Sequence, residues 1–175
     1  MMYNSHVTRG KRRASGAGTL TVVVGLCGSG KTWLLERVGQ ACPDVSTFDE
    51  GFSDRGPHGT ARRRAVADVI LSGRHVVVAD LWCGYRPRRR QVLQNLRRMV
   101  PDVFVQWLWY ENDLSTANHN CRLRTNKADA EGHVAINDRW SPHLTMPKGA
   151  VVFPIHAVGG VVERNHSMVL AIPSL

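Results

Sequence analysis

The chain has 175 residues, of which 43% are hydrophobic and 21% charged, a composition that is typical of a folded domain and excludes wholesale disorder. Its length predicts one domain, and no apolar run approaches the roughly 18 residues of a membrane-spanning helix. Lysine and arginine number 23 against 14 acidic residues, a net charge of +9 that favours a polyanionic partner. Four widely spaced cysteines and no apolar leader indicate a cytoplasmic protein with reduced thiols.

The predicted elements begin after a basic, polar tail over residues 1–18, which we expect to be disordered, so that the folded domain covers 19–175. An apolar, β-branched run over 19–25 predicts a buried strand, and a helix follows the next glycine-rich segment until Gly39. The rest of the chain alternates in the same way. Strands are predicted over 45–48, 75–81, 103–110 and 150–155, and helices over 60–71, 87–99 and 113–124.

Strands that alternate with helices predict an α/β fold of three layers, in which helices cover both faces of a mostly parallel, five-stranded sheet. Pro154 places the last strand at an edge or at its own end. Residues 125–149 are polar and irregular, although a short helix could form near 134–140, and the region from about 113 to 149 is expected to be a small lid. Two weak apolar runs between 158 and 172 have no predicted place in the fold.

The segment GLCGSGKT matches the phosphate-binding pattern G-x-x-x-x-G-K-[ST] at every fixed position, and it lies between a predicted strand and a predicted helix. Its glycines let backbone amides approach phosphate oxygens closely, and the helix N-terminus adds a positive dipole end. Lys31 is expected to reach the β- and γ-phosphates, and the hydroxyl of Thr32 to bind Mg²⁺. We therefore predict that ATP and Mg²⁺ bind to Gly25, Leu26, Cys27, Gly28, Ser29, Gly30, Lys31 and Thr32.

Two aspartates follow predicted strands at the sheet edge where such a loop binds its ligand. Asp80 comes after four apolar residues, as a Walker B aspartate does. We expect Asp80 to hold, through a water molecule, the Mg²⁺ ion that the Thr32 hydroxyl binds. Asp49 is the predicted general base for an acceptor hydroxyl, with Glu50 as the alternative. A loop cap at Asp80 and an ordinary turn at Asp49 are the structural alternatives.

With these features the chain resembles, over roughly residues 19–155, the small P-loop kinases that act on nucleosides, nucleotides and polynucleotides. The resemblance is carried by GLCGSGKT, Asp49 in FDEGF, Asp80 in VVVADLW, and CRLR at 121–124. It implies an ATP-dependent phosphotransferase in which Asp49 is the base and lid arginines, at Arg122 and Arg124, contact the phosphates. Residues two apart on a helix point in different directions, so one of these two arginines should face the phosphates.

Arginines cluster after the strand of Asp80, close in sequence to the aromatic residues Trp33, Trp82 and Tyr85. Arginine clamps phosphates and aromatic rings stack on bases, so we predict a nucleic-acid contact. The predicted nucleic-acid residues are Arg86, Arg88, Arg89 and Arg90. If the tryptophans are core and the arginines ordinary surface, this prediction fails.

The acceptor predicted from these features is a hydroxyl of DNA, at a 5′ end or on a modified base such as 5-hydroxymethyl-uracil. The chain also resembles the bacteriophage kinases that act on that base, in which case it would work in the host cytoplasm. The first alternative is a small-molecule nucleoside or nucleotide kinase, and the second is a nucleic-acid-binding ATPase without phosphotransfer. No obligate protein partner is evident from the sequence. The NKAD at 126–129 matches a GTPase motif on paper, but it lies in a polar loop rather than after a buried strand.

Overall fold

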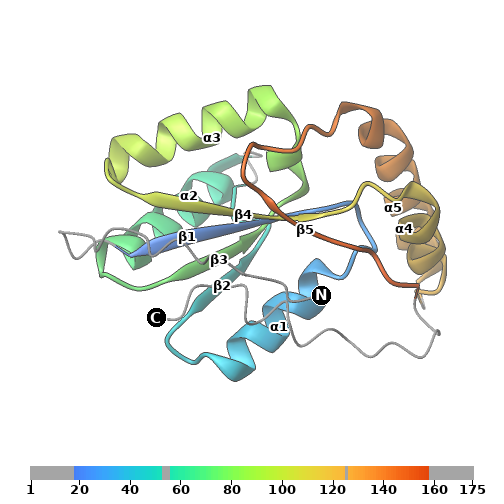
Figure 1. Cartoon of the computed structure of the whole chain (residues 1–175), viewed down its shortest axis with the longest axis horizontal. Coiled ribbons are helices and arrows are strands. Elements are labelled where there is room, and N and C mark those ends of the chain that lie inside the picture. The colour runs from blue at the N-terminus through green and yellow to red at the C-terminus, as the bar shows by residue number, and fades with distance from the viewer. Residues whose placement is uncertain (1–17, 53–55, 125, 158–175) are drawn as a thin grey trace, which may run out of the picture.

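The structure is a computed structural model that describes residues 18–52, 56–124 and 126–157, with the backbone alone at 56–59 (Figure 1). Its strands form one sheet in the order β2-β3-β1-β4-β5, and every neighbouring pair is parallel. This confirms the predicted α/β fold with a five-stranded sheet and places the last strand at an edge. The strands are β1 (Thr19–Val24), β2 (Ser46–Asp49), β3 (Val76–Ala79), β4 (Phe104–Tyr110) and β5 (Val151–Phe153).

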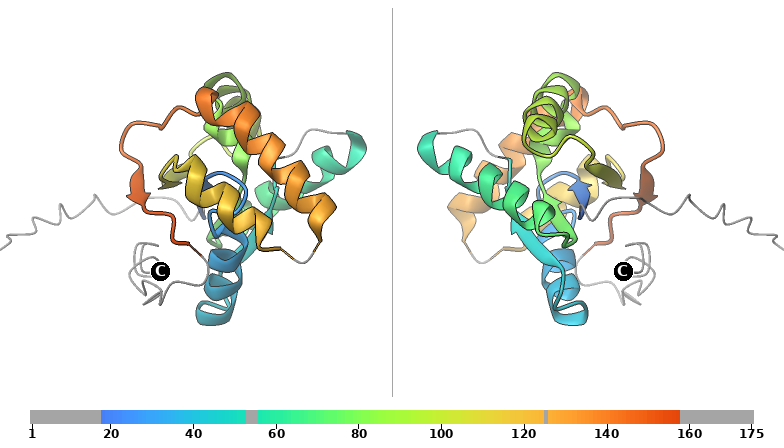
Figure 2. Two further views of the ribbon diagram at one scale, coloured as in Figure 1. Left: turned by 90° about the vertical axis from the view of Figure 1, so that its right-hand side faces the viewer. Right: turned by 90° about the vertical axis from the view of Figure 1, so that its left-hand side faces the viewer.

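Helices cover both faces of this sheet and its carboxyl edge. Helices α2 and α3 pack on one face and α1 on the other, while α4 and α5 lie at the end where the strands finish (Figures 1 and 2). The helices are α1 (Lys31–Ala41), α2 (Gly56–Leu71), α3 (Arg86–Met99), α4 (Leu114–Arg122) and α5 (Lys127–Trp140). Two short 3₁₀ helices, η1 (Leu81–Gly84) and η2 (Ser141–His143), follow β3 and α5.

The central strand β1 is mostly apolar because both of its sides are covered, and its one fully buried polar side chain, Thr21, is hydrogen-bonded to His75. Val22 and Val24 pack with α2 and α3, whereas Val23 packs with α1, and all three are fully or almost fully buried. Burial of an aliphatic side chain stabilises the fold by about 1.5–3 kcal/mol. The mostly apolar sequence of β1 therefore follows from the two-sided packing of a parallel sheet.

Several predicted boundaries are wrong. Helix α2, for example, begins at Gly56 rather than at residue 60. Gly39 does not end α1, because the burial of Leu34, Leu35 and Val38 outweighs the roughly 1 kcal/mol cost of an internal glycine. Strand β3 ends at Ala79, where Asp80 caps η1 by accepting from the backbone N–H of Trp82. Helix α5 begins seven residues earlier than the short helix predicted near 134–140, because Asn126 caps its start.

The predicted tail over residues 1–17 and the apolar runs between 158 and 172 lie outside the described residues. Within the described part, no helix is both long enough and apolar enough to span a membrane. All four cysteines, Cys27, Cys42, Cys83 and Cys121, are free thiols in this structure.

Candidate active site

The loop between β1 and α1 has the backbone conformation that its glycines were predicted to allow. Gly28 and Gly30 adopt φ angles of 82° and 100°, in the left-handed region that side chains disfavour. A Cβ atom at Gly28 would lie 2.4 Å from the carbonyl oxygen of Ala117 in α4. Glycine at this position therefore also allows the close approach of α4 to the loop.

Lys31, the first residue of α1, lies inside the curve of this loop. Its ammonium group donates to the carbonyl oxygens of Gly25, at 2.9 Å, and Leu26, at 2.8 Å. Desolvation lowers the pKa of Lys31, while the neighbouring Cys27 and Asp49 act in the opposite direction. The cation is thus held against backbone carbonyl oxygens of the loop.

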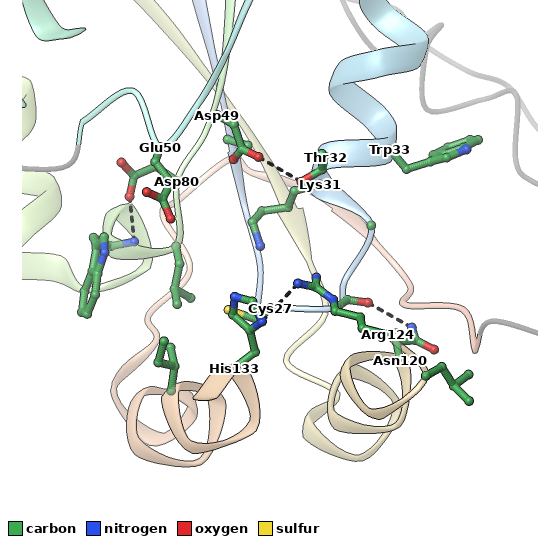
Figure 3. Close-up of a pocket in the computed structure, with 17 residues that line it drawn as sticks. Cys27, Lys31, Thr32, Trp33, Asp49, Glu50, Asp80, Asn120, Arg124 and His133 are labelled. Atoms are coloured by element: carbon green, nitrogen blue, oxygen red, sulfur yellow. Dashed lines mark hydrogen bonds between the residues drawn. The ribbon is translucent and has the colours of Figure 1, made fainter. Parts of the chain in front are cut away.

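Thr32 and Asp49 meet across the mouth of the loop, from the start of α1 and the end of β2. The hydroxyl of Thr32 donates to a carboxylate oxygen of Asp49, and the two oxygens are 2.9 Å apart (Figure 3). Adjacent ligands of an octahedral Mg²⁺, each about 2.1 Å from the ion, lie about 3 Å apart. Both groups are hard oxygen donors, the ligand type that Mg²⁺ prefers, so they would suit a Mg²⁺ ion that would neutralise phosphate charge.

Asp80, which was predicted to hold the metal, is in a different environment from Asp49. It is 1% exposed, and its two carboxylate oxygens accept from the backbone N–H groups of Trp82, at 2.8 Å, and Phe52, at 3.1 Å. Desolvation by burial raises its pKa to about 6, against the lowering effect of these amides. Asp80 therefore fixes the backbone after β2 and β3, and its contact with a metal through water stays a prediction.

Glu50 occupies a strained backbone position at the end of β2. Its φ angle is 53°, the only positive value at a non-glycine residue in the described part of the chain. Its N–H donates to the carbonyl oxygen of Ala79 at 2.8 Å, which holds this turn against β3. Such strain persists only where surrounding structure enforces it, and it is concentrated at functional sites. Glu50 is exposed and faces the same cavity as Asp49.

Of the two lid arginines, the structure brings Arg124 to the site. Arg124 follows α4, lines the cavity, and its guanidinium lies 3.1 Å from a ring nitrogen of His133 in α5. Arg122 is exposed and does not line the cavity. Which of the two arginines contacts the phosphates stays a prediction.

Two asparagines that sequence analysis did not identify hold the outer backbone of the loop. Asn137 of α5 is fully buried, accepts from the N–H of Cys27 at 2.8 Å and donates to its carbonyl oxygen at 2.9 Å. It also donates to the side-chain oxygen of Asn118 at 2.9 Å. Asn120 of α4 donates to the carbonyl oxygens of Gly28, at 3.0 Å, and His156, at 2.8 Å. We call Asn120 and Asn137 the asparagine clamp.

The clamp explains how α4 and α5 keep a fixed place beside the loop. Figure 2 shows the two helices lying over the carboxyl edge of the sheet, where α1 begins. Their asparagines replace the partners that the loop backbone would otherwise find in water, so moving the helices away would expose these polar groups. Asparagine within a helix carries no distinctive sequence signal, and only its burial in the fold reveals this role.

The predicted nucleic-acid residues divide into buried and exposed groups. Arg89 is 8% exposed and donates to the carbonyl oxygens of Cys83, at 3.0 Å, and Thr145, at 2.7 Å. Its position inside the fold does not fit contact with a polyanion, so the nucleic-acid role predicted for Arg89 is wrong. Arg88 is partly buried and donates to the side chain of Gln91 and the carbonyl oxygen of Phe52. Arg86 and Arg90 are exposed.

These groups surround one cavity of about 530 Å³ at the carboxyl edge of the sheet (Figure 3). It is lined by Cys27, Gly28, Gly30, Lys31, Thr32, Trp33, Asp49, Glu50, Ala79, Asp80, Leu81, Trp82, Asn120, Leu123, Arg124, His133 and Ile136. The cavity thus brings together the glycine-rich loop with Lys31, the hydrogen-bonded oxygens of Thr32 and Asp49, the carboxylate of Glu50 and the guanidinium of Arg124.

Neither a protein-family model nor a curated protein matches this sequence. Solved structures match the fold. A gluconokinase from Sinorhizobium meliloti 1021 superposes with a TM-score of 0.54 at 18% identity, over 81% of this chain and 85% of that one. A protein from Chloroflexus aurantiacus j-10-fl, provisionally assigned as a kinase, gives 0.59 at 15% identity, over 89% and 94%. The protein APE1195 gives 0.59 at 16% identity, over 91% and 99%. The chain therefore shares its fold with these three structures.

Proposed function

We propose that the protein transfers the γ-phosphate of ATP to a hydroxyl group of a small molecule. The observation that carries this proposal is the meeting of Lys31, Thr32 and Asp49 at one cavity that Glu50 and Arg124 also line. The likeness of the fold to a gluconokinase supports a small-molecule acceptor more than the DNA acceptor predicted from the sequence. DNA as acceptor stays a prediction.

In this proposal the loop amides and Lys31 hold the β- and γ-phosphates, and Arg124 contacts the transferred group from the opposite side. Mg²⁺, held by Thr32 and Asp49, would neutralise phosphate charge. The acceptor oxygen forms a bond to the γ-phosphorus while the bond from that phosphorus to the bridging oxygen of ADP breaks. Glu50 accepts the hydroxyl proton and later returns it to water, because Asp49 is occupied by the Thr32 hydroxyl.

The test is a transfer assay with γ-labelled ATP, Mg²⁺ and three sets of acceptors: sugars and sugar acids, nucleosides, and oligonucleotides. We expect labelled product on a small molecule, and a loss of about 10³-fold in Lys31→Met, because the developing charge on the γ-phosphoryl group loses its cation. Lys148→Met is the matched control, since Lys148 is exposed and does not line the cavity. Release of inorganic phosphate with no labelled acceptor in any set would contradict the proposal and favour a plain ATPase.

A further inference from the structure

The cavity has a phosphate half and an acceptor half, which lie on either side of Lys31. In Figure 3, Thr32, Asn120 and Arg124 lie on one side of the Lys31 side chain, and Glu50 and Asp80 lie on the other. Since the loop and its cations bind the nucleotide, the side with the carboxylates is left for the acceptor. This division rests on the proposed function.

The acceptor half is acidic and apolar. Besides Glu50 and Asp80, its lining includes Leu81 and Trp82 of η1, which directly follow Asp80 in the chain. The cationic side chains among the described lining residues are Lys31 and Arg124, and in the proposed reaction both contact the phosphates of ATP. The ring of His133 is hydrogen-bonded to Arg124. A phosphate or carboxylate on the acceptor would therefore face carboxylates without a counterion, at a cost that low dielectric increases.

An aromatic wall extends from this half of the cavity to the surface. The ring of Trp82 meets that of Trp140 edge to face, with centroids 4.7 Å apart, and Tyr85 meets Trp140 at 5.7 Å. The guanidinium of Arg139 lies 5.5 Å from the centre of the Trp140 ring. Trp82 is only partly buried and its ring is held against that of Trp140, so it offers an aromatic surface to a ligand.

We propose that the acceptor half binds an uncharged, flat ring that carries the reacting hydroxyl, and that Trp82 determines this specificity. Two sources share this chemistry: a free nucleoside, and a nucleoside within a nucleic-acid strand. Tyr85 is 36% exposed and leads directly into α3, whose first turns carry the exposed Arg86 and Arg90. We call these two arginines the rim pair. Phosphates that flank a bound nucleoside could reach them, so the two sources can be separated.

The first experiment varies only the charge of the acceptor. It compares transfer to 5-hydroxymethyl-2′-deoxyuridine with transfer to its 5′-monophosphate, which keeps the same hydroxymethyl group. We expect kcat/KM to be at least about tenfold higher for the uncharged nucleoside, because the added phosphate would approach the carboxylates of Glu50 and Asp80. Gluconate, an acyclic anion, should be a poorer acceptor than either. Preference for the monophosphate or for gluconate would overturn this inference and leave the proposed function intact.

The second experiment replaces the aromatic surface. Trp82→Leu should raise KM for the nucleoside by roughly tenfold, the usual loss when a stacked base loses its aromatic partner, with KM for ATP unchanged. Trp82→Phe should restore most of the affinity, which a merely structural role would not require. An equal rise in KM for ATP, or no change in KM for the nucleoside, would contradict the role of Trp82.

The third experiment identifies the source of the ring. If the acceptor lies in a strand, an oligonucleotide with one 5-hydroxymethyl-uracil should be used better than the free nucleoside, and increasingly so at low salt. Alanine at both rim positions should then raise KM for the oligonucleotide more than KM for the nucleoside. The matched control is alanine at Arg97 and Arg98, which are exposed in the last turn of the same helix. If kcat/KM is equal for the oligonucleotide and the nucleoside, and alanine at the rim pair changes neither, the acceptor is the free nucleoside.

Failure of this inference can be told from failure of the proposed function. Labelled product on sugar acids alone refutes the ring acceptor but keeps the kinase. No labelled product from any acceptor, under conditions where ATP binds, refutes both.

Discussion

The two halves of the cavity are built in different ways. The phosphate half is built mainly on eight consecutive residues, with their backbone amides, glycine conformations and one lysine at the start of α1, and Asn120 and Arg124 join it from the region of α4. The acceptor half is assembled from separate segments, the end of β2 and η1, with Trp140 of α5 against Trp82, and depends on side chains. A site made of contiguous backbone can be recognised from a motif, whereas a site made of distant side chains exists only after folding. The predictions below test this contrast, beginning with the largest expected effect.

The first prediction separates the carboxylates at the boundary of the two halves. Glu50→Gln should lower kcat by roughly 10²- to 10⁴-fold at every Mg²⁺ concentration, because it removes the proton acceptor. Asp49→Asn should instead raise the Mg²⁺ concentration needed for half-maximal activity, and excess Mg²⁺ should restore much of kcat. The measurement is kcat across a Mg²⁺ titration for both variants.

Each substitution is the control for the other, since both keep the shape of the side chain and remove one negative charge. An active Glu50→Gln beside an Asp49→Asn that excess Mg²⁺ cannot restore would make Asp49 the base, as the sequence alone predicted.

The second prediction concerns the asparagine clamp, which holds α4 and α5 against the loop of the phosphate half. Asn137→Leu leaves the N–H and carbonyl oxygen of Cys27 and the side-chain oxygen of Asn118 without their buried partner. We expect the free energy of unfolding in urea to fall by about 2–4 kcal/mol. KM for ATP should rise more than kcat falls, because a loosened loop must be ordered on binding.

Asn137→Asp is the informative control, since its carboxylate can still accept from Cys27 but cannot donate to either oxygen. An intermediate loss of stability is expected for it. A variant with leucine that binds ATP as tightly as the unchanged protein would show that the clamp does not position the loop.

The third prediction compares the buried Asp80 with its exposed counterpart Asp49, through pH. The pKa of Asp80 is raised from 3.8 to about 6 in the folded protein, so between these values the folded state binds more protons than the unfolded state. Its contribution therefore makes the protein more stable as pH falls from about 6 towards 4, by up to about 3 kcal/mol.

Asp80→Asn should remove this contribution, so the difference in stability between variant and unchanged protein should depend on pH in that window. The measurement is urea unfolding without Mg²⁺ from pH 4 to 7, with Asp49→Asn as the matched control. A difference that is constant across the window would show that Asp80 ionises as an ordinary surface carboxylate.

The smallest effect is expected for the arginines of α3. Arg89→Leu should lower the free energy of unfolding by about 1–3 kcal/mol, because the carbonyl oxygens of Cys83 and Thr145 lose their donor. Arg90→Ala, one residue further along, should change it by less than about 0.5 kcal/mol because Arg90 is exposed. Equal effects in urea unfolding would mean that the burial of Arg89 contributes nothing to stability.

The sequence alone predicted the order of strands and helices and the phosphate half of the site. Both depend on residues close together in the chain. The apolar run before GLCGSGKT indicates a strand buried on both faces. The spacing of Gly25, Gly30, Lys31 and Thr32 indicates a loop that binds through its own backbone. It also identified Asp49, Glu50 and Asp80 as the acidic residues at the carboxyl edge, because each follows a strand. These inferences needed no knowledge of which segments meet.

The roles of those residues were decided only by tertiary contacts. Asp49 accepts a hydrogen bond from the Thr32 hydroxyl, whereas the buried Asp80 accepts from two backbone N–H groups. The residues next to each aspartate in the sequence do not indicate this difference. The same is true of Arg89 against Arg90, and of Asn137, whose partner Cys27 is 110 residues away in the chain. Burial and hydrogen bonding between distant segments determine which polar groups lose water and which keep it. A pattern of residue types does not determine which polar groups are buried or which of them form hydrogen bonds, because both depend on how the folded segments pack.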